Sequence, residues 1–171
     1  GPLPVKNVDF GGGLERIAAA SRNDPDMFTI DSLYPLIEKI KELSGKEYAG
    51  ETKRGFQVIS DHLRAAVMLV SDGVTPSNKT QGYMLRRLIR RAVRYGRLIG
   101  IEKSFAGALV GTVVKIYGEA YPELADRQEH IAAVLTQEEE KFQGTISRGL
   151  KEIGKMSQLD GKIAFYFYET Y

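Results

Sequence analysis

The stretch FQVISDHLRAAVMLVSDGVTPSNKTQGYMLRRLIRRAVRYGRLIG, residues 56–100, sets the helical character of this chain. Apolar residues recur at helical spacing in its first part, which ends at Gly73, and recur again in its second part. The polar segment between the two parts, residues 72–78, has the composition of a turn. We therefore predict two amphipathic helices, over about 56–70 and about 78–99, joined by a short connector.

The second predicted helix carries six arginines and no acidic residue, the arginines being at positions 86, 87, 90, 91, 94 and 97. Four of them fall within about 80° of one another, opposite an apolar arc that includes Leu85 and Ile89. A solvated helix face usually intersperses acids at i,i+4 spacing, and this segment has none. Because arginine offers planar donors that suit phosphate, the pattern favours a nucleic-acid partner over a solvated face. The net charge is only +2 since acids such as residues 138–140 lie elsewhere, which predicts a dipolar surface.

The segment TPSNKTQGY, residues 75–83, has two interpretations. In the first, Ser77 or Asn78 caps the arginine helix and Gln81 reaches back as in a capping box. In the second, Asn78 contacts a base edge in the shallow minor groove of an RNA helix. The residue types favour the cap, but both roles are compatible because backbone atoms can perform the capping.

The segments on either side of this stretch are also predicted to be mostly helical. Apolar residues recur at helical spacing over 30–43 until Gly45. A further helix is expected over about 104–117, and a long one from Pro122 to about residue 153. The chain is therefore predicted to be mainly α.

The two ends of the chain are less regular. PVKNVDF followed by GGGLERIAAA predicts a short extended segment, a glycine turn and a helix entered near Gly13. The glycine triplet lacks the spacing of a dinucleotide fingerprint and the Lys-Ser/Thr of a P-loop. The tail IAFYFYETY, residues 163–171, suits a strand, whereas Asp160 and Gly161 before it suit the start of a helix.

Composition restricts the class of protein. The chain has 171 residues, of which 43% are hydrophobic, enough for one domain with a core. It has no cysteine, and His62 and His130 are far apart, so we expect a reducing compartment and no zinc centre. No apolar run reaches the roughly 18 residues that span a bilayer. The opening Gly1 and Pro2 resemble a cleavage scar, and we expect the chain to be cut from something longer.

The DHLR segment offers little for catalysis. Asp61 and Arg64 at i,i+3 spacing predict an ion pair on the helix surface, and no hydroxyl or thiol is placed to complete a triad. His62 is expected to be a core or interface histidine.

Four segments together resemble the alanyl-tRNA synthetases, a family of class II aminoacyl-tRNA ligases. NVDFGGGLERIAA (7–19) resembles that family's third signature motif, and residues 58–100 resemble the heart of its tRNA-recognition domain. LTQEEEKFQGTISRGL (135–150) and GKIAFYFYETY (161–171) match later landmarks in the same order. The resemblance implies a parent enzyme that attaches alanine to tRNA(Ala) with ATP and Mg²⁺ in the cytoplasm.

The third signature motif supplies the expected small-molecule contacts. The resemblance implies that Arg16 holds an ATP phosphate, with Gly13 also binding ATP. Asp9 would contact the amino group of alanine, with Gly11 giving access to the backbone. Phe10 stands where the common pattern has threonine, which alters the expected shape of the amino-acid pocket.

The tRNA contacts follow from the later segments. The family reads a G·U wobble at the third base pair of the acceptor stem, through an asparagine that maps to Asn78 and an aspartate in a Tyr-Asp-Thr-Tyr pattern. The second pattern reads Tyr-Glu-Thr-Tyr here, so Glu169 keeps the carboxylate with a longer reach. Arg90 is expected to be the main phosphate contact, supported by Arg86, Arg87, Arg91 and Arg94.

The resemblance covers essentially the whole chain and divides it into two parts. Residues 1–22 correspond to the C-terminal edge of the catalytic domain, a strand-turn-helix remnant, and residues 23–171 to the multi-helix tRNA-recognition domain. The family's other two signature motifs, its zinc-bearing editing domain and its oligomerisation region lie outside these residues. We therefore expect no cofactor or metal bound to this chain and no alanine-dependent ATP-pyrophosphate exchange by the isolated chain.

Other interpretations keep the arginine helix but change its partner. It could dock on an acidic protein surface, or bind RNA or DNA without reading any base pair. The expected partner is the tRNA(Ala) acceptor stem, with ATP and alanine binding only in the intact enzyme, and no membrane or DNA partner is expected.

Overall fold

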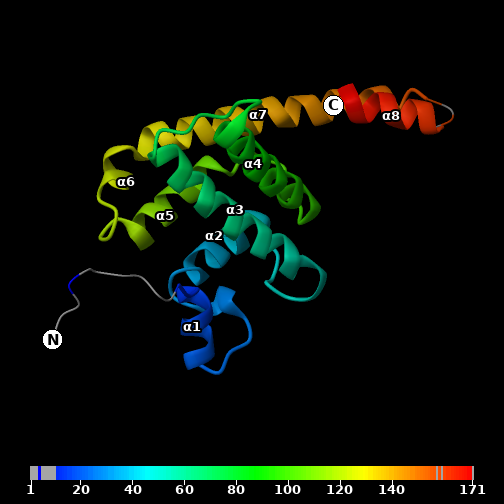
Figure 1. Ribbon diagram of the computed structural model, residues 1–171. Coiled ribbons are helices and arrows are strands. Elements are labelled where there is room, and N and C mark those ends of the chain that lie inside the picture. The colour runs from blue at the N-terminus through cyan, green and yellow to red at the C-terminus, as the bar shows by residue number, and fades with distance from the viewer. Residues whose placement is uncertain (1–3, 5–10, 157, 159, 171) are drawn as a thin grey trace.

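The computed structural model describes residue 4 and residues 11–156, 158 and 160–170, apart from the side chains of residues 168 and 169. Within this part of the chain there are eight α-helices, three single-turn 3₁₀ helices and no strand (Figure 1). In chain order they are α1 Leu14–Ser21, η1 Met27–Thr29, α2 Tyr34–Ser44, η2 Gly50–Thr52, α3 Lys53–Ser71, α4 Thr80–Leu98, η3 Gly107–Leu109, α5 Val110–Tyr117, α6 Glu123–Asp126, α7 Gln128–Ile153 and α8 Gly161–Thr170.

The predicted helix pair over residues 56–100 is confirmed as α3 and α4, which pack together at the centre of the fold. Their inward residues are fully buried: Phe56, Ile59, Leu63, Val67, Leu85, Ile89 and Val93. The end of α4 is held close to the following segment, because a Cβ on Gly96 would lie 2.4 Å from the Phe105 ring. The mainly α class is likewise confirmed.

Helices α2, α5 and α7 complete the core around this pair. α2 ends where predicted, since Gly45 takes the left-handed conformation (φ 65°) that glycine adopts without strain. Figure 1 shows α7 extending beyond the other helices, with α8 at its far end. No helix in the described ranges is long and apolar enough to cross a bilayer.

The long helix predicted from Pro122 is wrong in one respect, because it is divided into α6 and α7. Arg127 interrupts the helical backbone with φ −104° and ψ 4°. Its guanidinium donates a short hydrogen bond to the Ser71 carbonyl at the end of α3, while Leu124 is fully buried. The break is therefore set by a tertiary contact that the local sequence does not reveal.

The two ends of the chain give different outcomes. The extended segment predicted before Gly13 falls mostly outside the described residues, whereas the helix after it is α1. At the other end, the ambiguous tail forms α8, and the Asp160 carboxylate accepts a hydrogen bond of 2.8 Å from the Ile163 amide. A side-chain acceptor at this position satisfies a free amide of the first turn.

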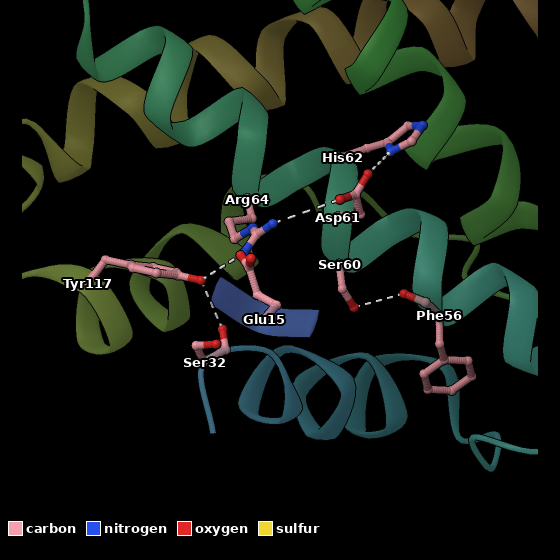
Figure 2. A network of polar contacts seen from close by, with 8 residues as sticks. All are labelled: Glu15, Ser32, Phe56, Ser60, Asp61, His62, Arg64 and Tyr117. Atoms are coloured by element: carbon pink, nitrogen blue, oxygen red, sulfur yellow. Dashed lines mark hydrogen bonds and ion pairs between the residues drawn. The ribbon is translucent and has the colours of Figure 1, made fainter. Parts of the chain in front are cut away.

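α1 is fastened to the rest of the fold by a partly buried polar network (Figure 2). Arg64 on α3 pairs with Glu15 on α1 at 2.6 Å and donates to the Tyr117 hydroxyl at 3.0 Å. That hydroxyl in turn donates to the Ser32 carbonyl. Hydrogen bonding to Arg64 lowers the pKa of Glu15. The predicted pair with Asp61 is present but longer, at 3.9 Å, so Arg64 chiefly anchors α1.

Candidate nucleic-acid interface

One face of α4 forms an open groove together with α7. The groove has a volume of about 490 Å³. We call it the arginine groove, and it is lined by Tyr83, Arg86, Arg87, Arg90, Arg91, Arg94, Tyr95 and Phe142. The five arginines predicted from the sequence to contact tRNA therefore line one surface, whereas Arg97 does not line it.

Two of these arginines are already paired inside the protein. Glu138 on α7 is 3% exposed, and its Oε1 accepts a hydrogen bond of 2.9 Å from the Arg90 Nε. The same oxygen lies 3.2 Å from the Arg86 Nε, which is an ion-pair distance, although this nitrogen makes no hydrogen bond among the described residues. The Arg90 guanidinium also lies over the Phe142 ring, 5.1 Å from its centroid.

The dipolar surface predicted from residues 138–140 is wrong for two of the three acids. Glu138 lies beneath the arginines, and Glu139 is fully buried. Glu139 accepts hydrogen bonds from the Phe105 and Ala106 amides and the Ser104 hydroxyl. Burial raises the pKa of Glu139. Only Glu140 of the three is exposed, so these acids do not form a separate acidic surface.

The capping box predicted for residues 77–81 is also wrong. Lys79 occupies the N-cap position of α4, and no side chain caps the helix. Ser77 instead bonds to the Lys79 backbone through its hydroxyl and donates its own amide to the Gly82 carbonyl at 3.1 Å. Asn78 is exposed, and its Oδ1 accepts a short hydrogen bond from the Arg86 Nη1.

The loop that carries Asn78 is held tightly against the start of α4. A Cβ on Gly82 would lie 2.2 Å from the Ser77 Oγ and 2.4 Å from the Thr75 carbonyl oxygen, so only glycine permits this approach. Thr80 has φ 46°, a conformation that costs a non-glycine residue about 1–3 kcal/mol. This backbone places Asn78 beside the arginine groove.

Arg54 extends the basic surface onto α3, and sequence patterning gave it no role. A neighbouring cavity of about 130 Å³ is lined by Arg54, His62 and Arg91, among others. Hydrogen bonding to Arg54 lowers the pKa of Tyr95, which lines the arginine groove. His62 accordingly lies at an interface between helices, where its Nδ1 is 2.9 Å from the Asp61 carboxylate. No sequence signal pointed to Arg54, because it precedes the helix predicted over about 56–70, whereas α3 begins at Lys53.

The residues expected to bind ATP and alanine lie apart from this groove. Arg16 is exposed on α1, and its side chain folds back over Gly13. It lines an open depression of about 560 Å³ that shares no residue with the arginine groove. Gly11 is exposed, whereas Asp9 and the Glu169 side chain lie outside the described part of the chain. Within that part, no group of three His, Asp or Glu side chains could hold a metal ion.

Comparison with known proteins places the chain in a family. The family model described as tRNA synthetases class II (A) matches residues 1–171. The alanine–tRNA ligases of Fusobacterium nucleatum and Bacillus pumilus are each 42% identical to the chain, over 181 and 182 residues, and that of Deinococcus radiodurans is 42% identical over 176 residues. Each alignment covers 99% of this chain but only 20–21% of the relative. The chain therefore belongs to the class II (A) tRNA synthetase family.

Proposed function

We propose that this chain is the part of an alanine–tRNA ligase that binds the acceptor stem of tRNA(Ala) and reads its G·U third base pair. One observation carries the proposal: Asn78 lies exposed beside Arg86 at the edge of the arginine groove. A carboxamide next to a row of phosphate-binding groups can reach a base edge while the arginines hold the backbone.

In this proposal the phosphate contacts fall to the arginines that have no carboxylate partner within the described part of the chain. Among the described residues, no carboxylate lies within ion-pair distance of Arg87, Arg91 or Arg94, and all three are exposed. Their guanidinium groups suit bidentate contacts with phosphate oxygens. Arg86 and Arg90 are about a quarter and a third exposed, so they contribute while remaining in ion pairs with Glu138.

The proposed discrimination between G·U and G·C stems follows from the shape of the wobble pair. A G·U pair displaces its bases and presents the guanine amino group in the minor groove differently from a G·C pair. The shallow minor groove of RNA leaves that edge accessible to Asn78 and to the proposed second contact, Glu169. Groove contacts then specify the stem, whereas arginine–phosphate contacts position it.

The proposal assigns the N-terminal part to the ATP-dependent chemistry of the parent ligase. Residues 1–22 would be the edge of its catalytic domain and residues 23–171 its tRNA-recognition domain. Arg16 would hold an ATP phosphate in the presence of Mg²⁺, and Asp9 the amino group of alanine. The Arg64–Glu15 pair supports the role of Arg16, because it fixes the orientation of α1 on the helical body.

The test is a titration with two acceptor-stem hairpins that differ only in a G·U or G·C third pair. We expect the wild-type chain to prefer the wobble hairpin by about tenfold, because a single mismatched base pair typically changes binding by 1–3 kcal/mol. Asn78→Ala should reduce that preference while leaving the affinity for the G·C hairpin nearly unchanged. Equal losses on both hairpins would contradict the assignment of Asn78 to base reading.

General RNA binding is a second candidate, favoured by the open groove and by the three exposed arginines that have no carboxylate partner in the described part of the chain. It predicts equal affinity for the two hairpins and a strong decrease of both affinities with salt. The same titration therefore separates the two functions.

A further inference from the structure

Glu138 is a buried carboxylate, and one of its oxygens forms ion pairs with two arginines. Its Oε1 lies 2.9 Å from the Arg90 Nε and 3.2 Å from the Arg86 Nε, and the residue is 3% exposed. Burying a carboxylate is unfavourable unless cations and hydrogen bonds compensate for the lost water. Both arginines are therefore tied to one point on α7, which limits the directions that their guanidinium groups can take.

Phe142 adds a second contact on the same helix. It follows Glu138 by four residues, so both side chains lie on one face of α7. The Arg90 guanidinium is held between the carboxylate and the ring, whose centroid is 5.1 Å away. Two side chains of α7, a different helix from the one that carries Arg90, thus hold the Arg90 guanidinium in place.

Arg86 contacts both Glu138 and Asn78, so the position of Glu138 also affects the orientation of Asn78. Its Nε faces Glu138, while its Nη1 donates to the Asn78 Oδ1. Asn78 is exposed and takes no part in capping α4, so among the described contacts the one from Arg86 orients its carboxamide. A cavity of about 180 Å³ lies beneath, lined by Arg86, Glu138 and Lys141 among others. If the contact with Glu138 were lost, Arg86 would have space to turn away from Asn78.

We propose that Glu138 is a positioning residue of the RNA-binding surface, holding Arg86, and through it Asn78, in the orientation that reads the base pair. The inference rests on the proposed function. It predicts that Glu138 affects the choice between stems more than the strength of binding. Removing a negative charge from beneath the groove should, on charge alone, strengthen binding to any stem.

The test compares Glu138→Gln with Glu140→Gln in the two-hairpin titration. Both variants lose one negative charge from α7, but Glu140 is exposed and makes no ion pair in the described structure. We expect Glu140→Gln to keep the wild-type preference of about tenfold and Glu138→Gln to reduce it to about twofold, a change within the energy of one base-pair contact. The affinity of Glu138→Gln for the G·C hairpin should stay equal or increase. An unchanged preference, or an equal loss of affinity for both hairpins, would overturn the proposal.

A second readout does not depend on RNA. The side-chain amide signal of Asn78 in a nitrogen–proton NMR spectrum can be assigned by its absence from Asn78→Ala. It should shift in Glu138→Gln and stay in place in Glu140→Gln, and an unmoved signal in both variants would refute positioning. If the wild-type chain shows no preference between hairpins, the proposed function fails, while this spectrum still decides the role of Glu138. If Glu138→Gln does not fold, Glu138→Asp, which keeps the charge and shortens the side chain, takes its place in both measurements.

Discussion

Arg94→Ala removes one of the three exposed arginines of the groove that have no internal carboxylate partner. Such an arginine is free to displace a counterion from an RNA phosphate. Because Arg94 makes no ion pair in the described part of the chain, its loss leaves no buried charge uncompensated. The substitution therefore tests phosphate binding without a large effect on folding.

The number of arginines in the groove sets the expected salt dependence of RNA binding. Each neutralised phosphate changes the slope of log K against log salt by about 0.9 for a duplex. The three arginines without a carboxylate partner give a slope of about −2.7, and all five arginines of the groove would give about −4.5. Arg94→Ala should bring the slope closer to zero by about 0.9 and weaken binding to both hairpins equally.

Fluorescence anisotropy with a labelled hairpin, repeated between about 50 and 200 mM salt, measures the slope. Arg97→Ala is the matched control, since Arg97 lies on α4 and is exposed but does not line the groove. A slope unchanged by Arg94→Ala but reduced by Arg97→Ala would refute the location of the phosphate contacts. A wild-type slope near −4.5 would show that Arg86 and Arg90 also release counterions despite their contacts with Glu138.

Three other substitutions test separate parts of the structure. Gly82→Ala places a Cβ 2.2 Å from the Ser77 Oγ, so it should displace the loop and abolish hairpin preference while circular dichroism still shows folded helices. Arg64→Met removes the anchor of α1 and should lower the free energy of unfolding in urea by about 2 kcal/mol, with Lys155→Met, in an exposed ion pair with Glu152, as a control that should change it by less than 1 kcal/mol. Burial raises the pKa of Glu139 above its ordinary 4.5, so the native state keeps that proton to higher pH than the unfolded chain. The contribution of Glu139 to stability should therefore fall as pH rises from about 4.5, and urea titrations of Glu139→Gln across pH 4–7 should lack that fall.

The helices could be predicted from sequence wherever apolar spacing and glycine stops decide them. The periodic apolar residues of α3 and α4 match their buried faces, and Gly45 ends α2 because it adopts a left-handed backbone. The break at Arg127 could not be predicted, since the side chain reaches a carbonyl on α3. Local patterns do not contain that information.

The same limit applies to the candidate site. The arginines and Asn78 were identified from residue types and from the family resemblance, and the structure brings them to one surface. The partner of Arg86 and Arg90 was missed because Glu138 lies 48 residues from Arg90, on another helix. Within the sequence of α4 no acid balances the arginines, so the sequence predicted a face without any carboxylate partner. In the folded chain, α7 packs against that face and supplies one, Glu138. The cap was predicted wrongly because Ser77 and Gly82 use backbone contacts that only the folded loop reveals.

The most direct measurement of the central claim is the affinity of the unmodified chain for the G·U and G·C hairpins at low and moderate salt. The account predicts that the wobble hairpin binds about tenfold more tightly and that this ratio survives added salt, because the base contact is not a counterion effect. Equal affinities that fall together with salt would contradict it, leaving the arginine groove as a phosphate-binding surface without base-pair recognition.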